Sequence, residues 1–395
     1  MKRGGGGGGA ARARLALLAL ACAAGACAGS KGAQKSKAGA TVVLPATKPE
    51  ARVHFEEGLR LMEDPSKAEA AIEAFTRASN ADKHLFEAFH DLGIVQVRLG
   101  RWDDAAESLA RALEIQPGSR RTVTALAEVY LRGHHPGDAA QLLEQQLGSE
   151  GRADTDRVDA DPGDAAATSS DAGVQEMRLL YVQALREAGK LTRALEQVEK
   201  LLASSGRSAR GFNALGLVYY KMDKPALAET ALRHAVELDG KSAEVWSNLG
   251  LVALARGRDR EAFEDFDKAV ALDEAFIEAR LNKAGVLLDC GDYTRALAEL
   301  EKAARARPND PDVLVALGVA RRGAGKPDEA RRAYEGALAI APEFPAAHFN
   351  LGILYMDFLS DKAKAREHLQ VYRKVAPSGD RGQKEAELRL KELRP

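Results

Sequence analysis

Few stretches of this 395-residue sequence carry residue types that could do chemistry. The stretch from Gly323 to Lys326 invites comparison with a phosphate-binding loop, in which glycines and a lysine surround phosphate groups. Ala320 stands where the first glycine of such a loop belongs, and Pro327 stands where Ser or Thr would hold magnesium. We therefore interpret this stretch as a turn between two helices.

Two groups of polar residues contain metal-ligating residue types. The pair His134-His135 has no cysteine nearby and no convincing set of further ligands for zinc. Acidic residues are frequent between residues 148 and 173, but their spacing is not that of a calcium-binding EF-hand loop. We predict a turn at the histidines, a solvated loop at the acidic stretch, and neither a metal ion nor a cofactor.

Motifs of the common enzyme classes are missing from the sequence. It contains no serine nucleophile elbow, no HExxH and no dinucleotide-binding glycine motif, so an enzyme interpretation has no residues to name. Lys+Arg at 57 and Asp+Glu at 58 nearly cancel, and neither sign forms a long patch that would attract nucleic acid. We expect a non-catalytic protein with no nucleic-acid partner and no small-molecule substrate.

The N-terminus has the composition of an export signal. Basic residues within 2–14 precede an apolar run over 15–26, which is too short to span a bilayer. The small residues 24–26 lead into Cys27, and this order resembles a bacterial lipoprotein signal, whose cysteine becomes the lipid-modified first residue of the mature chain. Cys22 is the rival lipidation site, and ordinary cleavage after an Ala-x-Ala site without lipidation is the alternative.

The resemblance implies a location as well. The protein would be exported to the cell envelope and held by its lipid on a membrane, facing the periplasm. Ala28 follows Cys27 where some bacteria use an aspartate to retain lipoproteins at the inner membrane, so the outer membrane is favoured. Residues 28–50 are rich in Ser, Lys, Gly, Ala and Pro without helical periodicity, which predicts a flexible tether.

A repeat of 34 residues organises the rest of the chain. A small residue recurs at that interval, an alanine follows twelve residues later, a large residue comes four further on, and a second alanine follows three beyond that. The four series are Gly216, Gly250, Ala284, Gly318 and Gly352; Ala228, Ala262, Ala296 and Ala330; Leu232, Phe266, Leu300 and Tyr334; and Ala235, Ala269, Ala303 and Ala337. The pattern resembles the tetratricopeptide repeat, appears most fully from Phe89 to Pro117, and covers about Ala51 to Pro377.

The fold class follows from this repeat. Small residues in mid-helix allow two helices to approach closely, and glycine after the first helix takes the left-handed C-cap conformation without strain. One helix hairpin cannot bury its own apolar face, so neighbouring repeats must stack. We predict an all-α protein, a right-handed α-solenoid of about nine tandem helix-turn-helix units with a C-terminal capping helix.

The repeats and their interruptions define the domains. We place a signal peptide at 1–27, the tether at 28–50, and repeats one to three at 51–147. Residues 148–174 lack the repeat pattern and are rich in acidic residues, which predicts an acidic disordered insertion. Repeats four to nine follow at 175–377, and residues 378–395 form the capping helix and tail.

The resemblance also implies a binding surface. In this family the concave face is lined by fixed positions of the first helix of each repeat, and here those positions are unusually apolar. The predicted groove residues are Leu217, Tyr220, Asn248, Leu251, Leu254, Leu281, Asn282, Leu288, Val315, Val319, Phe349, Asn350, Ile353 and Met356. The asparagines resemble a ladder that holds a peptide backbone in some members, although such an asparagine is also common in the repeat consensus.

Two interpretations of the apolar positions remain open. They could dock a protein or peptide ligand, or they could be buried by superhelical packing, by the acidic insertion or by the C-terminal helix. Our first hypothesis is a membrane-tethered scaffold or adaptor that assembles or positions an envelope complex of the motility, pilus or secretion type. The alternative is an accessory or regulatory subunit that presents substrates to a catalytic partner.

Overall fold

The structure is a computed structural model that describes residues 48–155, 166–205, 207–380 and 382–393. The predicted signal peptide, both candidate lipidation sites, Cys27 and Cys22, and nearly all of the predicted tether lie outside the described residues. Within the described residues there are 19 α-helices and no strand, which confirms the predicted all-α class.

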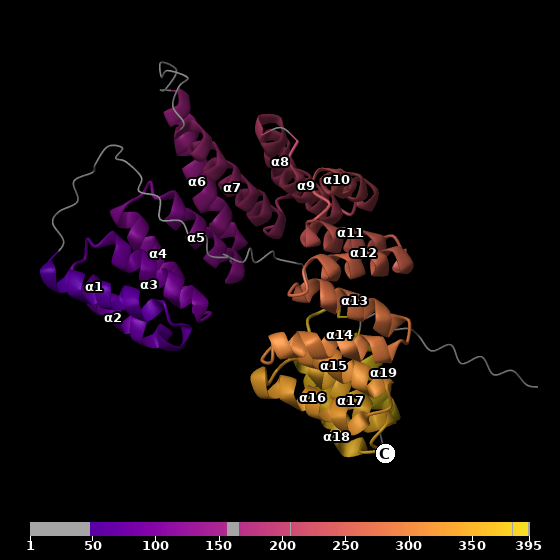
Figure 1. Cartoon of the computed structure of the whole chain (residues 1–395). Coiled ribbons are helices and arrows are strands. Elements are labelled where there is room, and N and C mark those ends of the chain that lie inside the picture. The colour runs from indigo at the N-terminus through magenta and orange to yellow at the C-terminus, as the bar shows by residue number, and fades with distance from the viewer. Residues whose placement is uncertain (1–47, 156–165, 206, 381, 394–395) are drawn as a thin grey trace, which may run out of the picture. The chain divides into compact units, whose positions relative to one another are not determined.

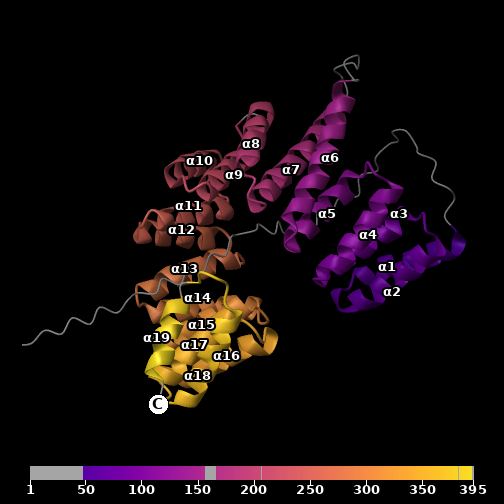
Figure 2. The same ribbon diagram turned by 180° about the vertical axis from the view of Figure 1, so that it is seen from behind.

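The helices divide into two compact units after Leu238. In the N-terminal unit they pair in chain order as antiparallel hairpins (Figure 1), and Figure 2 shows the same pairs from behind. A short 3-10 helix at Pro65–Lys67 accommodates the extra residue of the first repeat. The helices are α1 Pro49–Met62, α2 Ala68–Ala81, α3 Phe86–Arg98, α4 Trp102–Ile115, α5 Arg120–Arg132, α6 Pro136–Thr155, α7 Ala166–Glu187, α8 Leu191–Ser205, α9 Ala209–Lys221 and α10 Pro225–Leu238.

The C-terminal unit contains four further hairpins and a last single helix. Helix α19 packs against α18, so the predicted C-terminal helix is present at the end of the array. The helices are α11 Ala243–Ala255, α12 Asp259–Leu272, α13 Ile277–Asp289, α14 Tyr293–Ala306, α15 Pro311–Gly323, α16 Pro327–Ile340, α17 Pro345–Asp357, α18 Lys362–Val375 and α19 Gly382–Glu392.

Each hairpin is held by a small residue under a large one. A Cβ atom added to Gly250 would lie 2.6 Å from the Phe266 ring, and one added to Gly318 would lie 2.3 Å from the Tyr334 ring. The alanines of the repeat, such as Ala262, are fully buried. Close approach of the two helices therefore explains why a poor helix former stands in mid-helix.

The turns between the two helices explain the glycines that recur after the first helix of a repeat. Five turn glycines have φ between 71° and 76°, the left-handed region that glycine enters without strain. His134 and Asp223 take the same place in their repeats with φ of 61° and 57°. The chain therefore adopts the same turn geometry even where the repeat lacks its glycine.

The predicted insertion needs a correction. Helix α6 continues to Thr155 and α7 begins at Ala166, so the residues from 148 to 155 and from 166 to 174 are helical and not an irregular loop. Only residues 156–165 of the predicted insertion lie outside the described part of the chain. Extension is favoured because each residue added to an existing helix gains one backbone hydrogen bond, and alanine is the best helix former.

Candidate functional site

In the C-terminal unit, the first helix of each repeat lies on the inner side of the stack. In the C-terminal unit α11 contacts α13, α13 contacts α15, and α15 contacts α17, in addition to the contacts within each hairpin. The second helices make no comparable contact with one another in the described part of that unit. The more closely packed helices must line the inner face of a curved stack, so residues of α11, α13, α15 and α17 form this face.

Half of the predicted groove residues are buried and cannot contact a ligand directly. Four of them are apolar and at most 8 % exposed, because they pack between successive first helices: Leu251, Leu281, Val315 and Val319. Val315 and Val319 belong to a cluster that includes Leu351 and Tyr355 of the next repeat. The packing interpretation therefore applies to these positions. The sequence pattern predicted that they line the groove, but the adjacent repeat in the stack covers them.

The asparagines are buried too. Asn248, Asn282 and Asn350 are 1 %, 4 % and 4 % exposed. The Asn350 side-chain amide donates to the backbone carbonyl of Ala346, one turn back in its own helix, at 2.8 Å. The Asn282 Nδ2 atom is buried without a hydrogen-bond partner among the described residues, so of these two asparagines only Asn350 is shown to serve its own helix.

The other half of the predicted set is half-buried. Leu217 and Tyr220 lie on α9 of the N-terminal unit. Phe349 packs against the Tyr372 ring, with ring centroids 5.0 Å apart, and so belongs to the last hairpin. The remaining four residues are accessible in part from α11, α13 and α17, and we call them the inner apolar row: Leu254, Leu288, Ile353 and Met356.

Arg322 of α15 stands where Leu254, Leu288 and Met356 stand in their repeats. Its Nη1 atom is buried and has no hydrogen-bond acceptor among the described residues. A ligand cannot reach that buried atom, but the Arg322 side chain as a whole is only partly buried, and an arginine at this place favours a ligand that brings a carboxylate or a carbonyl oxygen. The sequence analysis missed this residue because it searched the row for apolar side chains only.

A network of charged side chains fixes the helices that carry the middle of the row. Arg280 Nη1 and Glu299 Oε2 lie 2.6 Å apart, and Lys283 Nζ lies 2.8 Å from Glu299 Oε1 and 2.7 Å from Asp267 Oδ1. Burial raises the pKa of Glu299, but hydrogen bonds from Lys283 and Arg280 outweigh it and lower the pKa overall. Glu299 thereby joins α13 and α14, and Asp267 joins α12 to the same Lys283 of α13.

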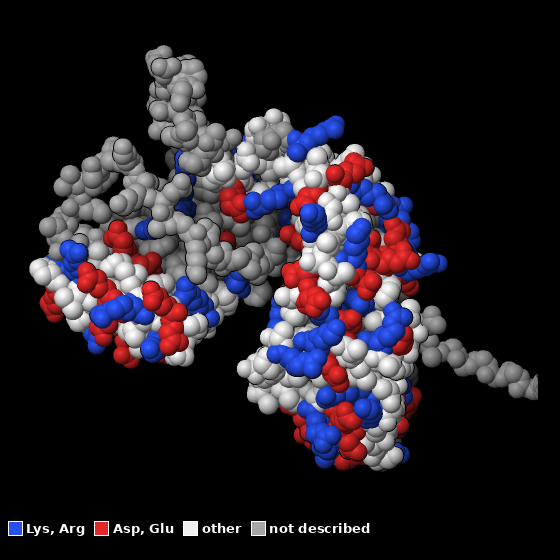
Figure 3. All heavy atoms as spheres, in the orientation of Figure 1, with Lys and Arg blue, Asp and Glu red and all other residues white. Residues whose placement is uncertain are grey.

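The stretches that resembled catalytic or metal sites have structural roles. Gly325 is a left-handed turn residue, and Lys326 forms an ion pair with Glu329 at 3.4 Å. The residues that the structure describes include no group of three or more His, Cys, Asp and Glu side chains able to hold a metal ion. Figure 3 shows Lys and Arg interspersed with Asp and Glu over the displayed face of the C-terminal unit.

No helix in the described ranges is both long enough and apolar enough to cross a bilayer.

Comparisons with known proteins agree with this architecture. Two family models described as tetratricopeptide repeat match the chain, one at residues 59–120, 213–275 and 315–380 and the other at 96–156 and 253–317. Among curated proteins, the chain is 24 % identical over 249 residues to a peroxisomal targeting signal receptor of Kluyveromyces lactis, covering 63 % of this chain and 41 % of the receptor. It is 29 % identical over 178 residues to cellulose synthase operon protein C of Xanthomonas axonopodis pv. citri, covering 43 % of this chain and 12 % of that protein.

The chain thus spans less than half the length of these two curated relatives. Among solved structures, it is similar to pilF of Pseudomonas aeruginosa at 19 % identity and a TM-score of 0.47, covering 55 % of this chain and 96 % of that chain. It is also similar to PilW, described as a type IV pilus biogenesis factor, at 19 % identity and a TM-score of 0.48, covering 56 % of this chain and 98 % of that chain.

Proposed function

The chain belongs to the tetratricopeptide repeat family, and we propose that it is a non-catalytic scaffold or adaptor that binds a protein partner along the inner apolar row. The observation that carries the proposal is that Leu254, Leu288, Ile353 and Met356 remain partly exposed on the inner face, while the neighbouring positions are buried. An apolar surface on a rigid helical face fits an extended or helical segment of another protein.

The side chains of the inner apolar row indicate what kind of partner segment they would bind. Apolar side chains would lie against Leu254, Leu288 and Met356, and an oxygen acceptor would meet the Arg322 guanidinium. The charged network behind the row keeps α13 in place, so the surface is formed before the partner arrives. A preformed surface loses less conformational entropy on binding than a flexible one.

We further propose that the protein is exported and held on a cell-envelope membrane by a lipid on Cys27, with Cys22 as the rival site. The support is the order of basic residues, apolar run, small residues and cysteine at the N-terminus, followed by a stretch suited to a tether. A scaffold in this position would assemble or position an envelope complex of the motility, pilus or secretion type. The outer membrane, facing the periplasm, is the favoured location.

Affinity purification from detergent-solubilised envelopes tests the binding surface. The wild type is compared with a Leu254→Lys, Met356→Lys double variant, whose fold is verified by circular dichroism. The matched control is Leu272→Lys, Ile340→Lys, because these residues are 39 % and 42 % exposed and lie at the ends of second helices. We expect the partner to be lost with the first pair and kept with the control, whereas a partner kept with both refutes the inner row as the docking surface.

The same experiment separates the two functional hypotheses. Structural envelope proteins in the recovered complex support an assembly role, and an enzyme recovered in their place supports the accessory-subunit role. Metabolic labelling with a radioactive fatty acid tests the anchor independently. Cys27→Ser should abolish the label and release the protein from membranes, while label lost only with Cys22→Ser assigns the rival site.

A further inference from the structure

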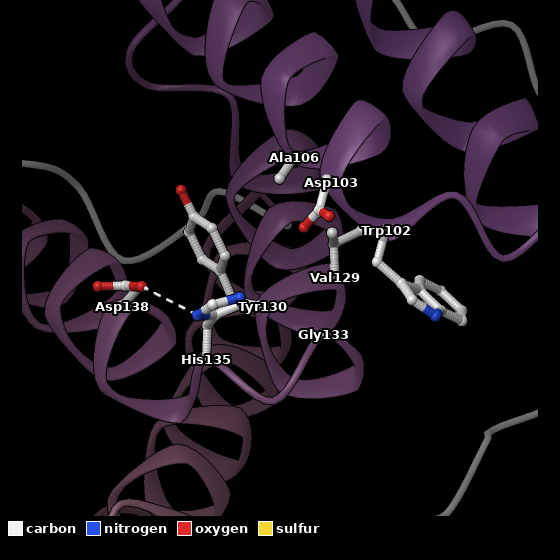
Figure 4. Close-up of a pocket in the computed structure, with 8 residues that line it drawn as sticks. All are labelled: Trp102, Asp103, Ala106, Val129, Tyr130, Gly133, His135 and Asp138. Atoms are coloured by element: carbon white, nitrogen blue, oxygen red, sulfur yellow. Dashed lines mark ion pairs between the residues drawn. The ribbon is translucent and has the colours of Figure 1, made fainter. Parts of the chain in front are cut away.

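A small pocket lies in the N-terminal unit where α4, α5 and α6 come together (Figure 4). Its volume is about 160 Å³. Ala106 and Val129 provide an apolar surface, and polar atoms come from Asp103, Tyr130, His135 and Asp138. Figure 4 shows Asp103 and Asp138 on opposite sides of the Tyr130 ring, and we call this site the Tyr130 pocket.

The two carboxylates come from different helices. Asp103 lies in the first turn of α4, and Asp138 lies in the first turn of α6. The partial positive charge at a helix N-terminus stabilises a carboxylate there.

Among the described residues, no lysine or arginine forms an ion pair with either carboxylate. Within the described residues, the ion-pair partner of Asp138 is His135, whose Nδ1 lies 3.8 Å from Asp138 Oδ2, and Asp103 has none. The neighbouring cation Arg132 lies over the Trp102 ring, 5.7 Å from its centroid. Helix-dipole stabilisation explains why acidic residues stand at these positions, but it does not explain the cavity between them.

The remaining features of the Tyr130 pocket indicate what kind of cation would fit it. Burial, together with the charge of Asp138, raises the pKa of the Tyr130 hydroxyl, and both residues line the pocket. The volume is well below the ~300 Å³ at which sites for drug-sized ligands begin. An apolar wall beneath separated carboxylates matches a side chain with a hydrocarbon stem and a charged end. A metal ion does not fit, since the described residues bring no three suitable ligands together.

We propose that the Tyr130 pocket receives a lysine or arginine side chain of a partner protein. The stem packs on Ala106 and Val129, and the cation lies between Asp103 and Asp138. The site goes beyond the inner apolar row, because it belongs to the other unit and takes a ligand of different chemistry.

Tryptophan fluorescence tests the proposal on the full-length protein. The chain has two tryptophans, so Trp246→Phe leaves Trp102, which lines the pocket, as the only reporter. The probes are capped Gly-Lys-Gly and Gly-Arg-Gly peptides, and the control probe carries norleucine, which keeps the stem and lacks the charge. We expect a saturable fluorescence change with at least one basic peptide and none with norleucine.

Variants assign the response to the pocket. Asp103→Asn with Asp138→Asn should weaken binding roughly tenfold, as expected from the loss of two partly exposed charge contacts. Asp104→Asn is the matched control, since Asp104 shares the first turn of α4 but does not line the pocket. No saturable change with either basic peptide, an equal response to norleucine, or equal weakening by Asp104→Asn would each overturn the proposal.

Discussion

His348 and His368 face each other across the last hairpin, with their Nδ1 atoms 3.0 Å apart. The Nε2 atom of His348 lies 2.9 Å from the carbonyl oxygen of Pro342, so this nitrogen carries the hydrogen and donates it. In a neutral pair, His348 Nδ1 must then accept a hydrogen bond from His368. An additional proton on His348 would place two N–H groups against each other.

This arrangement predicts acid sensitivity of the last hairpin. Burial, and then the neighbouring His348, lower the pKa of His368 from its ordinary value of 6.5. The unfolded chain therefore binds more protons below pH 6.5, and the free energy of unfolding falls as the pH falls toward the lowered value. We expect the wild type to lose stability between pH 7.5 and 5.5, and His368→Gln to lose less.

Thermal unfolding at both pH values measures this difference. The control is His234→Gln, because the His234 side chain is exposed. Equal losses in the wild type and in His368→Gln would contradict the role of the pair. His90 has its own pKa lowered to about 4 by burial and by Arg121, so it adds acid sensitivity in the N-terminal unit with the same sign.

The close approach of helices predicts opposite effects for two glycines of one hairpin. A Cβ atom on Gly318 would lie 2.3 Å from the Tyr334 ring, so Gly318→Ala should destabilise by roughly 1 to 3 kcal/mol through overpacking. A Cβ atom on Gly336 would have its nearest neighbour at 3.7 Å, so Gly336→Ala should stabilise by about 0.5 to 1 kcal/mol. Chemical denaturation measures both, and destabilisation by Gly336→Ala as large as by Gly318→Ala would refute the packing argument.

The charged network predicts that replacing the Glu299 carboxylate has a large effect on the free energy of unfolding. Glu299→Gln keeps the shape of the side chain but leaves Arg280, whose side chain is 5 % exposed, without its carboxylate. We expect a loss of about 3 kcal/mol in the free energy of unfolding. Glu264→Gln is the control, because its ion pair with Arg260 is exposed and should contribute nothing measurable. A small effect of Glu299→Gln would show that the network contributes little to stability.

Arg322 predicts a separation of stability from binding. Its Nη1 atom is buried without an acceptor among the described residues, so Arg322→Met should leave the free energy of unfolding unchanged or raise it by up to ~1 kcal/mol. The same substitution should weaken binding of the partner to the inner apolar row, since methionine has no guanidinium group to donate to an oxygen of the partner. Melting temperature and partner affinity are measured on the same preparation, and a clear loss of stability would assign Arg322 to packing.

The sequence predicted the hairpins well because their information is local. Gly250 and Phe266 are sixteen residues apart in one repeat, and the contact between them is the same in every hairpin that carries the pair. Exposure of the inner positions could not be predicted so well, since it depends on the next repeat. Leu251 and Leu254 are three residues apart, and only Leu251 is fully covered, in a cluster that includes Val286 of the following repeat.

The Tyr130 pocket shows the same difference between local and assembled information. Asp103 and Asp138 are 35 residues apart in the sequence. Each one, taken alone, is an acidic residue of the kind commonly found in the first turn of a helix. Their common pocket exists only after α4 and α6 have packed on α5. The insertion boundaries were wrong for a related reason, because loss of the repeat pattern does not imply loss of helix.

Helix α19 has a consequence for how the array could change in evolution. It covers the outer end of the last hairpin with Ala386, Leu390 and Leu393, where an additional repeat would otherwise stack. Recombination that duplicates or deletes a whole hairpin upstream leaves this terminator intact, so the length of the array can vary without creating an exposed apolar end. Loss of α19 would instead leave a surface open to the first hairpin of a second copy, and the expected product is a filament of chains joined end to end.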